Sequence, residues 1–145
     1  MSCDVLITGT GMFAGRIALD IASTAKTPVN VVIAGRNKMR LNWLKTAGNA
    51  RAAMFSTPAR FSTIEVDMVA DGTSDRLLEE CNPRIVVQAA SIQTSTVISD
   101  TGNRWTQLVA EGGLSATAVF QSLITSRMAA AISRRQNPPV LINCS

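Results

Sequence analysis

A glycine-rich turn close to the N-terminus is the feature that most constrains the fold of this chain. The apolar run Val5–Thr8 leads directly into the sequence GTGMFAG, where Gly9, Gly11 and Ala14 follow the spacing G-x-G-x-x-G/A. Gly9 permits a tight turn out of a strand, and Ala14 lets the next helix lie close to a sheet. The stretch therefore predicts a buried strand, a sharp turn and a helix, which together begin a βαβ unit.

The rest of the chain repeats this alternation of short apolar runs and helical patterns. The predicted strands are residues 5–8, 29–34, 63–66, 85–89 and 140–143. They are continuous apolar runs such as VVIA and IVVQAA, which is typical of strands buried on both faces of a parallel sheet. We therefore predict the α/β class, with a three-layer, Rossmann-type, doubly wound parallel sheet of about five strands. The 145 residues are expected to form a single domain of this kind, residues 1–145.

The helical patterns are less sharp than the strands. The predicted helices are residues 13–23, 39–46, 75–81 and 116–134. Ser74 is the expected N-cap of the third helix, and Asn82 with Pro83 is expected to end it. Along the last helix, apolar residues recur at helical spacing: Val119, Leu123, Ile124, Met128 and Ile132. Residues 48–61 and 91–113 receive no assignment from their pattern.

Composition excludes several classes of protein. Hydrophobic residues make up 46% of the chain and charged residues 17%, which is typical of a globular domain. No run reaches the roughly 18 apolar residues of a membrane helix, and the N-terminus lacks the basic start of a secretory signal. We therefore expect a cytoplasmic protein with no membrane partner. The net charge is +4, but the cations are scattered and aromatic residues are scarce, which argues against a nucleic-acid partner.

Cysteine and histidine usage argues against a metal or redox centre. The three cysteines, Cys3, Cys81 and Cys144, are widely spaced and form no CxxC pair, so we expect free thiols in a reducing compartment. The chain has no histidine, and we predict no metal site. It ends at PVLINCS just as a strand finishes, which suggests the N-terminal part of a larger protein.

The glycine-rich turn is also where the phosphates of a nucleotide would bind. Without a Cβ at Gly11, a pyrophosphate can approach the backbone. The N–H groups of Thr10, Met12 and Phe13, together with the positive end of the helix dipole, would then face the phosphates. The turn follows a strand and opens a helix, which is the context that this motif requires. The alternative is a glycine corner in an α/β protein that binds no nucleotide.

The end of the second predicted strand bears on the choice of cofactor. An NAD site usually has an acidic residue there, which accepts hydrogen bonds from the ribose hydroxyls. This chain instead reads VVIAGRNK, and residues 29–43 contain no acid. Gly35 leaves room, and Arg36, followed by Asn37 and Lys38, can bind a 2′-phosphate. NADP is therefore predicted over NAD, with the alternative that Arg36 and Lys38 are only solvated charges at the start of a helix.

Two further strand ends contribute candidates for cofactor binding. Asp67 follows the third predicted strand, where it lies near the adenine edge or serves only as a turn residue or helix cap. Ala89, Ala90 and Ser91 follow the fourth strand, across the crevice from Gly9. Small residues at this edge of an open parallel sheet make space for ribose and nicotinamide.

Together, the segments GTGMFAG, VVIAGRN, EVD and IVVQAAS resemble the N-terminal NADP-binding domain of the saccharopine dehydrogenase-like proteins. The resemblance covers residues 5–93 and is most specific at the small residues of the turn, including Gly15, and at Arg36. It implies a dinucleotide fold, use of NADP, and oxidoreductase chemistry on an amino-acid-like substrate held by a following domain. From Ser91 onward the layout is more similar to malate and lactate dehydrogenase-like domains. That similarity makes Asn143 a candidate near the nicotinamide, or simply a residue that caps its strand.

The sequence indicates no catalytic residue. It has no histidine to act as a general base and no tyrosine, which excludes the Tyr-x-x-x-Lys centre of short-chain dehydrogenases. We predict the NADP-binding domain of an oxidoreductase whose catalytic domain lies outside this chain and whose substrate is a small amino-acid-like or carbonyl compound. One alternative is a non-catalytic dinucleotide sensor, and another is an S-adenosylmethionine site, which Arg36 disfavours. A homodimer formed through an exposed crevice is a further expectation.

Overall fold

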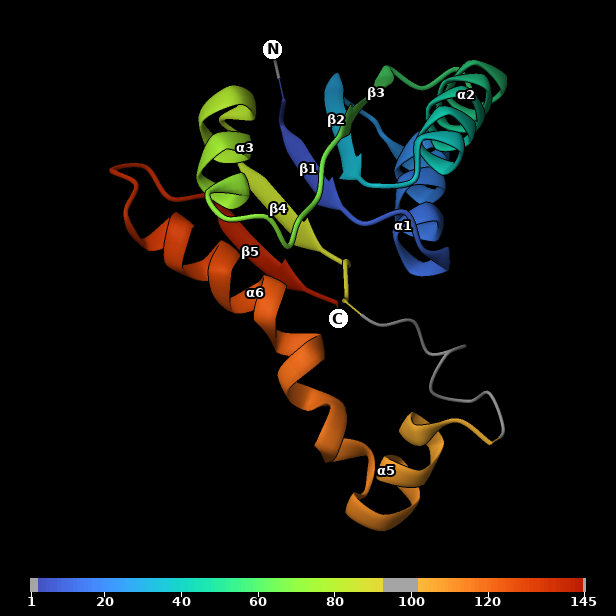
Figure 1. Ribbon diagram of the computed structural model, residues 1–145. Coiled ribbons are helices and arrows are strands. Elements are labelled where there is room, and N and C mark those ends of the chain that lie inside the picture. The colour runs from blue at the N-terminus through green and yellow to red at the C-terminus, as the bar shows by residue number, and fades with distance from the viewer. Residues whose placement is uncertain (1–2, 93–101, 145) are drawn as a thin grey trace.

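A computed structural model describes residues 3–92 and 102–144 of the chain, which form a five-stranded parallel sheet (Figure 1). The strand order is β3-β2-β1-β4-β5, so β1 is central and the chain crosses to its other side after β3. The strands are β1 (Val5–Thr8), β2 (Val29–Gly35), β3 (Ala59–Glu65), β4 (Ile85–Gln88) and β5 (Val140–Asn143). This topology confirms the predicted Rossmann-type parallel sheet.

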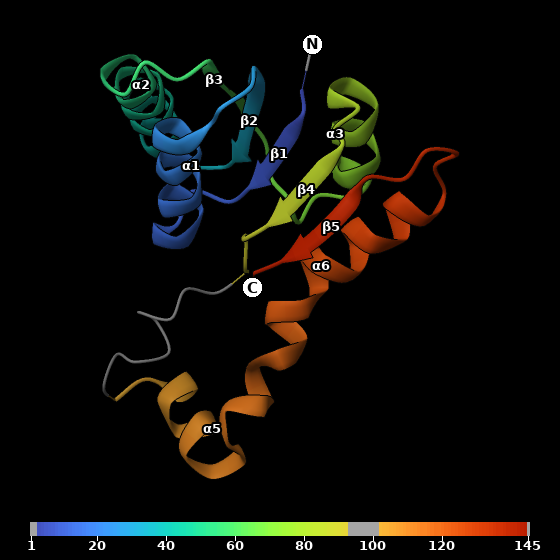
Figure 2. The ribbon, with the colours of Figure 1, turned by 180° about the vertical axis from the view of Figure 1, so that it is seen from behind.

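Helices cover both faces of the sheet (Figures 1 and 2). The helices are α1 (Met12–Thr24), α2 (Lys38–Met54), α3 (Thr73–Cys81), α5 (Arg104–Gly112), the 3₁₀ turn η1 (Leu114–Thr117) and α6 (Ala118–Ser133). α1 and α2 pack on one face, where Ile7 and Leu44 are buried, whereas α3 and α6 pack on the other, against Leu6 and Met128. Neighbouring residues of a strand point to opposite faces, which is why Leu6 and Ile7 belong to different cores. The predicted three layers are therefore present.

α2 is much longer than its sequence pattern indicates, and β3 begins earlier. The pattern predicts a helix that ends at residue 46, because Gly48 opens a stretch rich in small residues, but the helix continues to Met54. Gly48 is accommodated because it packs against the ring of Phe61: a Cβ there would lie 2.8 Å from Phe61 Cγ. The Asn49 side chain accepts a hydrogen bond from Phe61 N (3.1 Å) and donates one to Phe61 O (2.9 Å). Contacts with β3 thus extend both elements into the unassigned segment.

Two predicted helix boundaries need correction. Ser74 does not cap α3, because the helix begins at Thr73 after Gly72, which adopts the left-handed conformation at φ +73°. The predicted end at Asn82 is confirmed, and this residue is itself left-handed at φ +42°. α6 begins at Ala118, and Val119 is 71% exposed although it continues the apolar spacing of the buried Ile124. In Figure 1 the first half of α6 extends past the sheet together with α5, so this part of the helix does not pack on the sheet.

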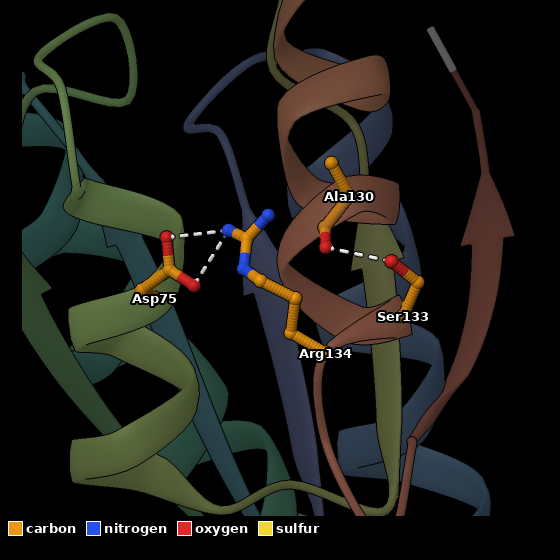
Figure 3. A network of polar contacts seen from close by, with 4 residues as sticks. All are labelled: Asp75, Ala130, Ser133 and Arg134. Carbon is orange, nitrogen blue, oxygen red and sulfur yellow. Dashed lines mark hydrogen bonds and ion pairs between the residues drawn. The ribbon is translucent and has the colours of Figure 1, made fainter.

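Polar contacts join the C-terminal end of α6 to α3 (Figure 3), and others join α6 to the loop that precedes α3. Arg134 Nη2 donates to both carboxylate oxygens of Asp75, at 2.7 and 2.8 Å, and Ser133 Oγ bonds back to Ala130 O at 2.8 Å. Closer to the carboxyl edge of the sheet, Arg127 donates to Val69 O and pairs with Asp71. These pairs are partly exposed, so each contributes about 0–1 kcal/mol to stability. They accompany the apolar packing of Ile124 and Met128, which holds α6 against the sheet.

Candidate functional site

A cavity of about 410 Å³ lies at the carboxyl-terminal edge of the sheet, where β1, β2, β3 and β4 end. This edge, beside the point where the strand order reverses, is where open α/β sheets bind their ligands. The cavity is lined by Gly9, Thr10, Gly11, Gly35, Arg36, Asn37, Arg40, Asp67, Met68, Val69, Ala89, Ala90, Ser91 and Ile124. The structure therefore brings most of the predicted site residues together. The predicted residues outside this lining are Met12, Phe13, Ala14 and Lys38.

Gly9 and Gly11 in the turn are glycines for different structural reasons. Gly9 has φ +107°, and a Cβ there would lie 2.8 Å from Ala89 O. Gly11 has an ordinary φ of −71°, and a Cβ there would meet no atom within 4 Å. The fold itself therefore requires a glycine at Gly9, whereas nothing in the described part of the chain requires one at Gly11. Open space at Gly11, on the cavity wall, leaves its backbone accessible to a ligand.

The N-terminus of α1 opens onto this cavity at Gly11. No side chain caps this helix end, and its first turn contains no acidic residue, so the positive end of the helix dipole is not neutralised locally. Met12 is 85% exposed and Phe13 is 56% exposed, so these side chains point to solvent and only their backbone groups belong to the turn. Ala14 is buried against the sheet, where a larger side chain would separate helix from strand.

Arg36 and Asp67 form the outer end of the cavity, after β2 and β3 respectively. Arg36 Nε lies 3.9 Å from Asp67 Oδ1, and the two side chains are 61% and 50% exposed. The same carboxylate oxygen accepts a hydrogen bond from Val69 N at 3.0 Å, which fixes the acid in the loop after β3. An exposed pair at this distance is worth about 0–1 kcal/mol, so the guanidinium of Arg36 can exchange Asp67 for another anion at little cost.

Asn37 and Gly35 shape the same end of the cavity. Asn37 is the N-cap of α2, and its side chain accepts a hydrogen bond from Arg40 N at 3.0 Å. Gly35 lies against the glycine-rich turn, where a Cβ would be 2.9 Å from the methyl group of Thr10. Lys38 follows in the first turn of α2, outside the cavity lining.

Sequence reasoning missed four lining residues: Arg40, Met68, Val69 and Ile124. The signal for Arg40 was present, because it belongs to the densest cluster of cations, GRNKMR, and lies four residues after Arg36. Arg40 Nε donates to Thr10 O at 3.2 Å, which joins α2 to the glycine-rich turn. Ile124 carried no local signal, because only the crossing of α6 over the sheet brings it to the cavity.

Buried polar contacts hold the inner end of the cavity beside β4. Thr8 and Gln88 are fully buried register partners at the ends of β1 and β4, and Thr8 Oγ1 donates to Gln88 Oε1. Gln88 Nε2 donates in turn to Ala90 O at 2.7 Å. These bonds fix the backbone that leads through Ala89 to Ser91. Asn143, the residue suggested by the lactate dehydrogenase-like layout, lies outside the cavity lining, and its side chain accepts a hydrogen bond from Thr125 at 3.0 Å.

The cysteines do not contribute to the cavity lining. All three are free, as expected, and Cys3 and Cys81 are buried together between β1 and α3. A hydrogen bond with Cys81 and burial raise the pKa of the Cys3 thiol well above its ordinary value. In the described part of the chain no cluster of acidic, cysteine and histidine side chains could hold a metal ion. None of the described helices combines the length and apolar character needed to cross a membrane.

Known structures share this architecture at low sequence identity. A lactate dehydrogenase of Cryptosporidium parvum, solved with lactic acid and nicotinamide adenine dinucleotide, matches 99% of this chain with a TM-score of 0.61 and 12% identity. A lactate dehydrogenase of Eimeria maxima, solved with NADH and oxamate, matches 99% with a TM-score of 0.59 and 14% identity. A short-chain type dehydrogenase/reductase of Mycobacterium ulcerans also matches 99%, with a TM-score of 0.53 and 17% identity.

These likenesses show the Rossmann fold. The chain spans 37% and 36% of the two lactate dehydrogenases and 52% of the reductase, so it corresponds to only part of each. No protein-family model and no curated protein matches the sequence.

Proposed function

We propose that this chain is the NADP-binding domain of an oxidoreductase. The observation that carries the proposal is the cavity at the carboxyl edge of the sheet, which combines an open glycine turn with Arg36 at the end of β2. Backbone N–H groups at the start of α1 would hold the pyrophosphate across Gly11. Ala89, Ala90 and Ser91 would border the nicotinamide end.

The choice of NADP rests on the charges at the outer end of the cavity. The end of β2 has no acid to accept the ribose hydroxyls, and Arg36 occupies the place where such an acid would lie. A guanidinium can bind a 2′-phosphate through charge-assisted hydrogen bonds. Asp67 is the only acid that lines the cavity in the described part of the chain, and its weak pairing leaves Arg36 available to a ligand.

The catalytic step would need groups beyond this cavity. The bound cofactor would supply hydride transfer, and the protein would orient it and provide a proton donor or acceptor. The part of the lining that the structure describes contains no lysine, and the whole chain contains neither histidine nor tyrosine. Because the chain spans about a third of the lactate dehydrogenases it resembles in fold, we place the substrate site in a further segment of the protein. The resemblance to saccharopine dehydrogenase-like proteins favours an amino-acid-like or carbonyl substrate.

The test is a thermal-unfolding titration of the chain with NADPH, NADH and S-adenosylmethionine in parallel. A ligand at about 100 times its Kd stabilises the folded state by about 2.7 kcal/mol. We expect a shift with NADPH at lower concentrations than with NADH, and none with S-adenosylmethionine. Absence of a shift with both dinucleotides would refute the proposal.

A charge reversal then tests the role of Arg36. Arg36→Asp should weaken NADPH binding by at least about tenfold while NADH binding changes less than about twofold. Arg84→Asp is a matched control, because Arg84 precedes β4 at the opposite edge of the sheet and its backbone N donates to Asp4 O. Equal losses for both cofactors would show that Arg36 does not recognise the 2′-phosphate.

A further inference from the structure

Arg40 is held at its guanidinium group and at its backbone N atom. The guanidinium carbon of Arg40 lies 5.7 Å from the centroid of the Trp43 ring, one turn along α2. Its Nε donates to Thr10 O in the glycine-rich turn at 3.2 Å. The backbone of the same residue is fixed because Arg40 N donates to Asn37 Oδ1. These contacts restrict the rotamer freedom of a long side chain, so less entropy is lost when a ligand binds to it.

The outer part of this guanidinium is available to a ligand. Among the residues that the structure describes, neither Nη atom of Arg40 donates to an acceptor. The hydrogen bond to Thr10 O is made by Nε. Arg40 lines the same cavity as Arg36, and Asp67, the single acid among the described residues of that lining, pairs with Arg36. Two guanidinium groups with one carboxylate leave the outer end of the cavity with a net positive charge. Such an arrangement favours an anion bound between the two cations.

Arg36 and Arg40 line the same cavity from two adjacent segments, the loop after β2 and the first turn of α2. Arg36 immediately follows β2, and Arg40 lies in the first turn of α2, which starts at Lys38. The hydrogen bond to Thr10 directs Arg40 toward the turn that precedes α1, whereas the contact with Asp67 directs Arg36 toward β3. Both arginines line the same cavity as Gly11, where the pyrophosphate would pass.

We propose that Arg40 is a second specificity-determining residue, whose Nη atoms bind the 2′-phosphate of NADP opposite Arg36. The inference rests on the proposed function and adds a residue that the sequence did not single out. Arg36 then approaches the phosphate from the loop between β2 and α2, and Arg40 approaches it from α2. Arg40 also keeps the carbonyl of Thr10 in place, but this second contact involves Nε and does not distinguish NADP from NAD.

The experiment compares Arg40→Met, Arg40→Lys and Arg51→Met with the unsubstituted chain by calorimetric titration with NADPH and NADH. Methionine keeps an apolar stem beside Trp43 and removes the guanidinium. Arg51→Met is the matched control, because Arg51 lies on the same helix and stacks on Phe55 at 5.1 Å but does not line the cavity. Arg40 is exposed, so its variants should fold, and unfolding curves without ligand check this.

Arg40→Met should weaken NADPH binding by about 10- to 100-fold, with NADH binding within about twofold of the unsubstituted chain. Arg40→Lys should recover part of the loss, because it restores the charge but not the paired donors. Arg51→Met should leave the ratio of the two affinities unchanged. Equal losses of NADPH and NADH binding for Arg40→Met would overturn the assignment and reduce Arg40 to a support of the turn. If the unsubstituted chain bound neither dinucleotide, both this inference and the proposed function would fail.

Discussion

Replacement of Gly9 by alanine is the sharpest test of how this structure uses its glycine-rich turn. At φ +107° the new side chain would sit in a conformation that L residues rarely adopt. Strain of this kind costs roughly 1–3 kcal/mol. Its Cβ would also lie 2.8 Å from Ala89 O and 2.9 Å from Ala90 N. Both are backbone atoms, so relief requires β4 to move, which costs roughly another 1–3 kcal/mol.

An effect on the unfolded state offsets part of this loss of stability. Alanine has fewer unfolded conformations than glycine, which stabilises the folded state by about 0.4–1 kcal/mol. The net destabilisation is therefore about 1–6 kcal/mol, a large share of the roughly 5–15 kcal/mol that is typical of such domains. For a chain of this size the melting temperature should fall by roughly 3–20 °C.

Gly11→Ala is the matched control within the same turn. Gly11 has φ −71° and open space around its Cβ position, so the same chemical change should cost less than about 1 kcal/mol as an N-cap substitution. Urea denaturation with unchanged m-values compares the two variants directly. The reasoning is refuted if Gly9→Ala stays within about 1 kcal/mol of the unsubstituted chain, or if Gly11→Ala is as damaging. In ligand titrations Gly11→Val should instead abolish binding of both NADPH and NADH while the fold survives.

Two further predictions concern Asp67 and Gly48. Asp67→Asn removes a negative charge beside the proposed 2′-phosphate site and releases Arg36, so NADPH should bind about fivefold more tightly, equivalent to about 1 kcal/mol, with NADH unchanged. Equal weakening for both cofactors in the same titration would mean that Asp67 contacts the adenine. Gly48→Ala should destabilise the fold by about 1–2 kcal/mol in urea, because its Cβ would lie 2.8 Å from Phe61 Cγ. In a Phe61→Leu background the substitution should be neutral or stabilising, and an undiminished loss there would disprove the steric explanation.

Local sequence was sufficient for the elements that begin and end on local signals. The strand–turn–helix from Val5 through α1 follows from an apolar run, two glycines and a small residue, and Asn82 with Pro83 ends α3 as expected. Where contacts with residues far apart in the sequence extend a helix or strand, the local pattern predicts the wrong end for that element. Gly48 indicates a break in isolation, yet α2 continues through it because Asn49 and Phe61 join the helix to β3.

The residues of the candidate site were predictable from the sequence where they directly follow a strand. Carboxyl ends of parallel strands meet at one edge, so residues that follow the strands, such as Gly9, Arg36, Asp67 and Ala89, can be grouped from the sequence alone. Residues that reach the cavity from a helix, and not from the end of a strand, cannot be grouped in this way. Ile124 reaches the cavity only because α6 packs across the sheet, with Ile124 and Met128 buried in the same core as Leu6.

The sequence by itself determined the class of fold and the edge at which a ligand would bind, because both depend on short-range periodicity and on the order of strands and helices. Only the tertiary structure decided which glycine the fold itself requires and which arginines share the cavity. The close approach of Gly9 to Ala89 joins residues eighty apart, and the bond from Arg40 to Thr10 joins residues thirty apart. Such distances are set by packing of strands and helices against one another, and no local pattern encodes them.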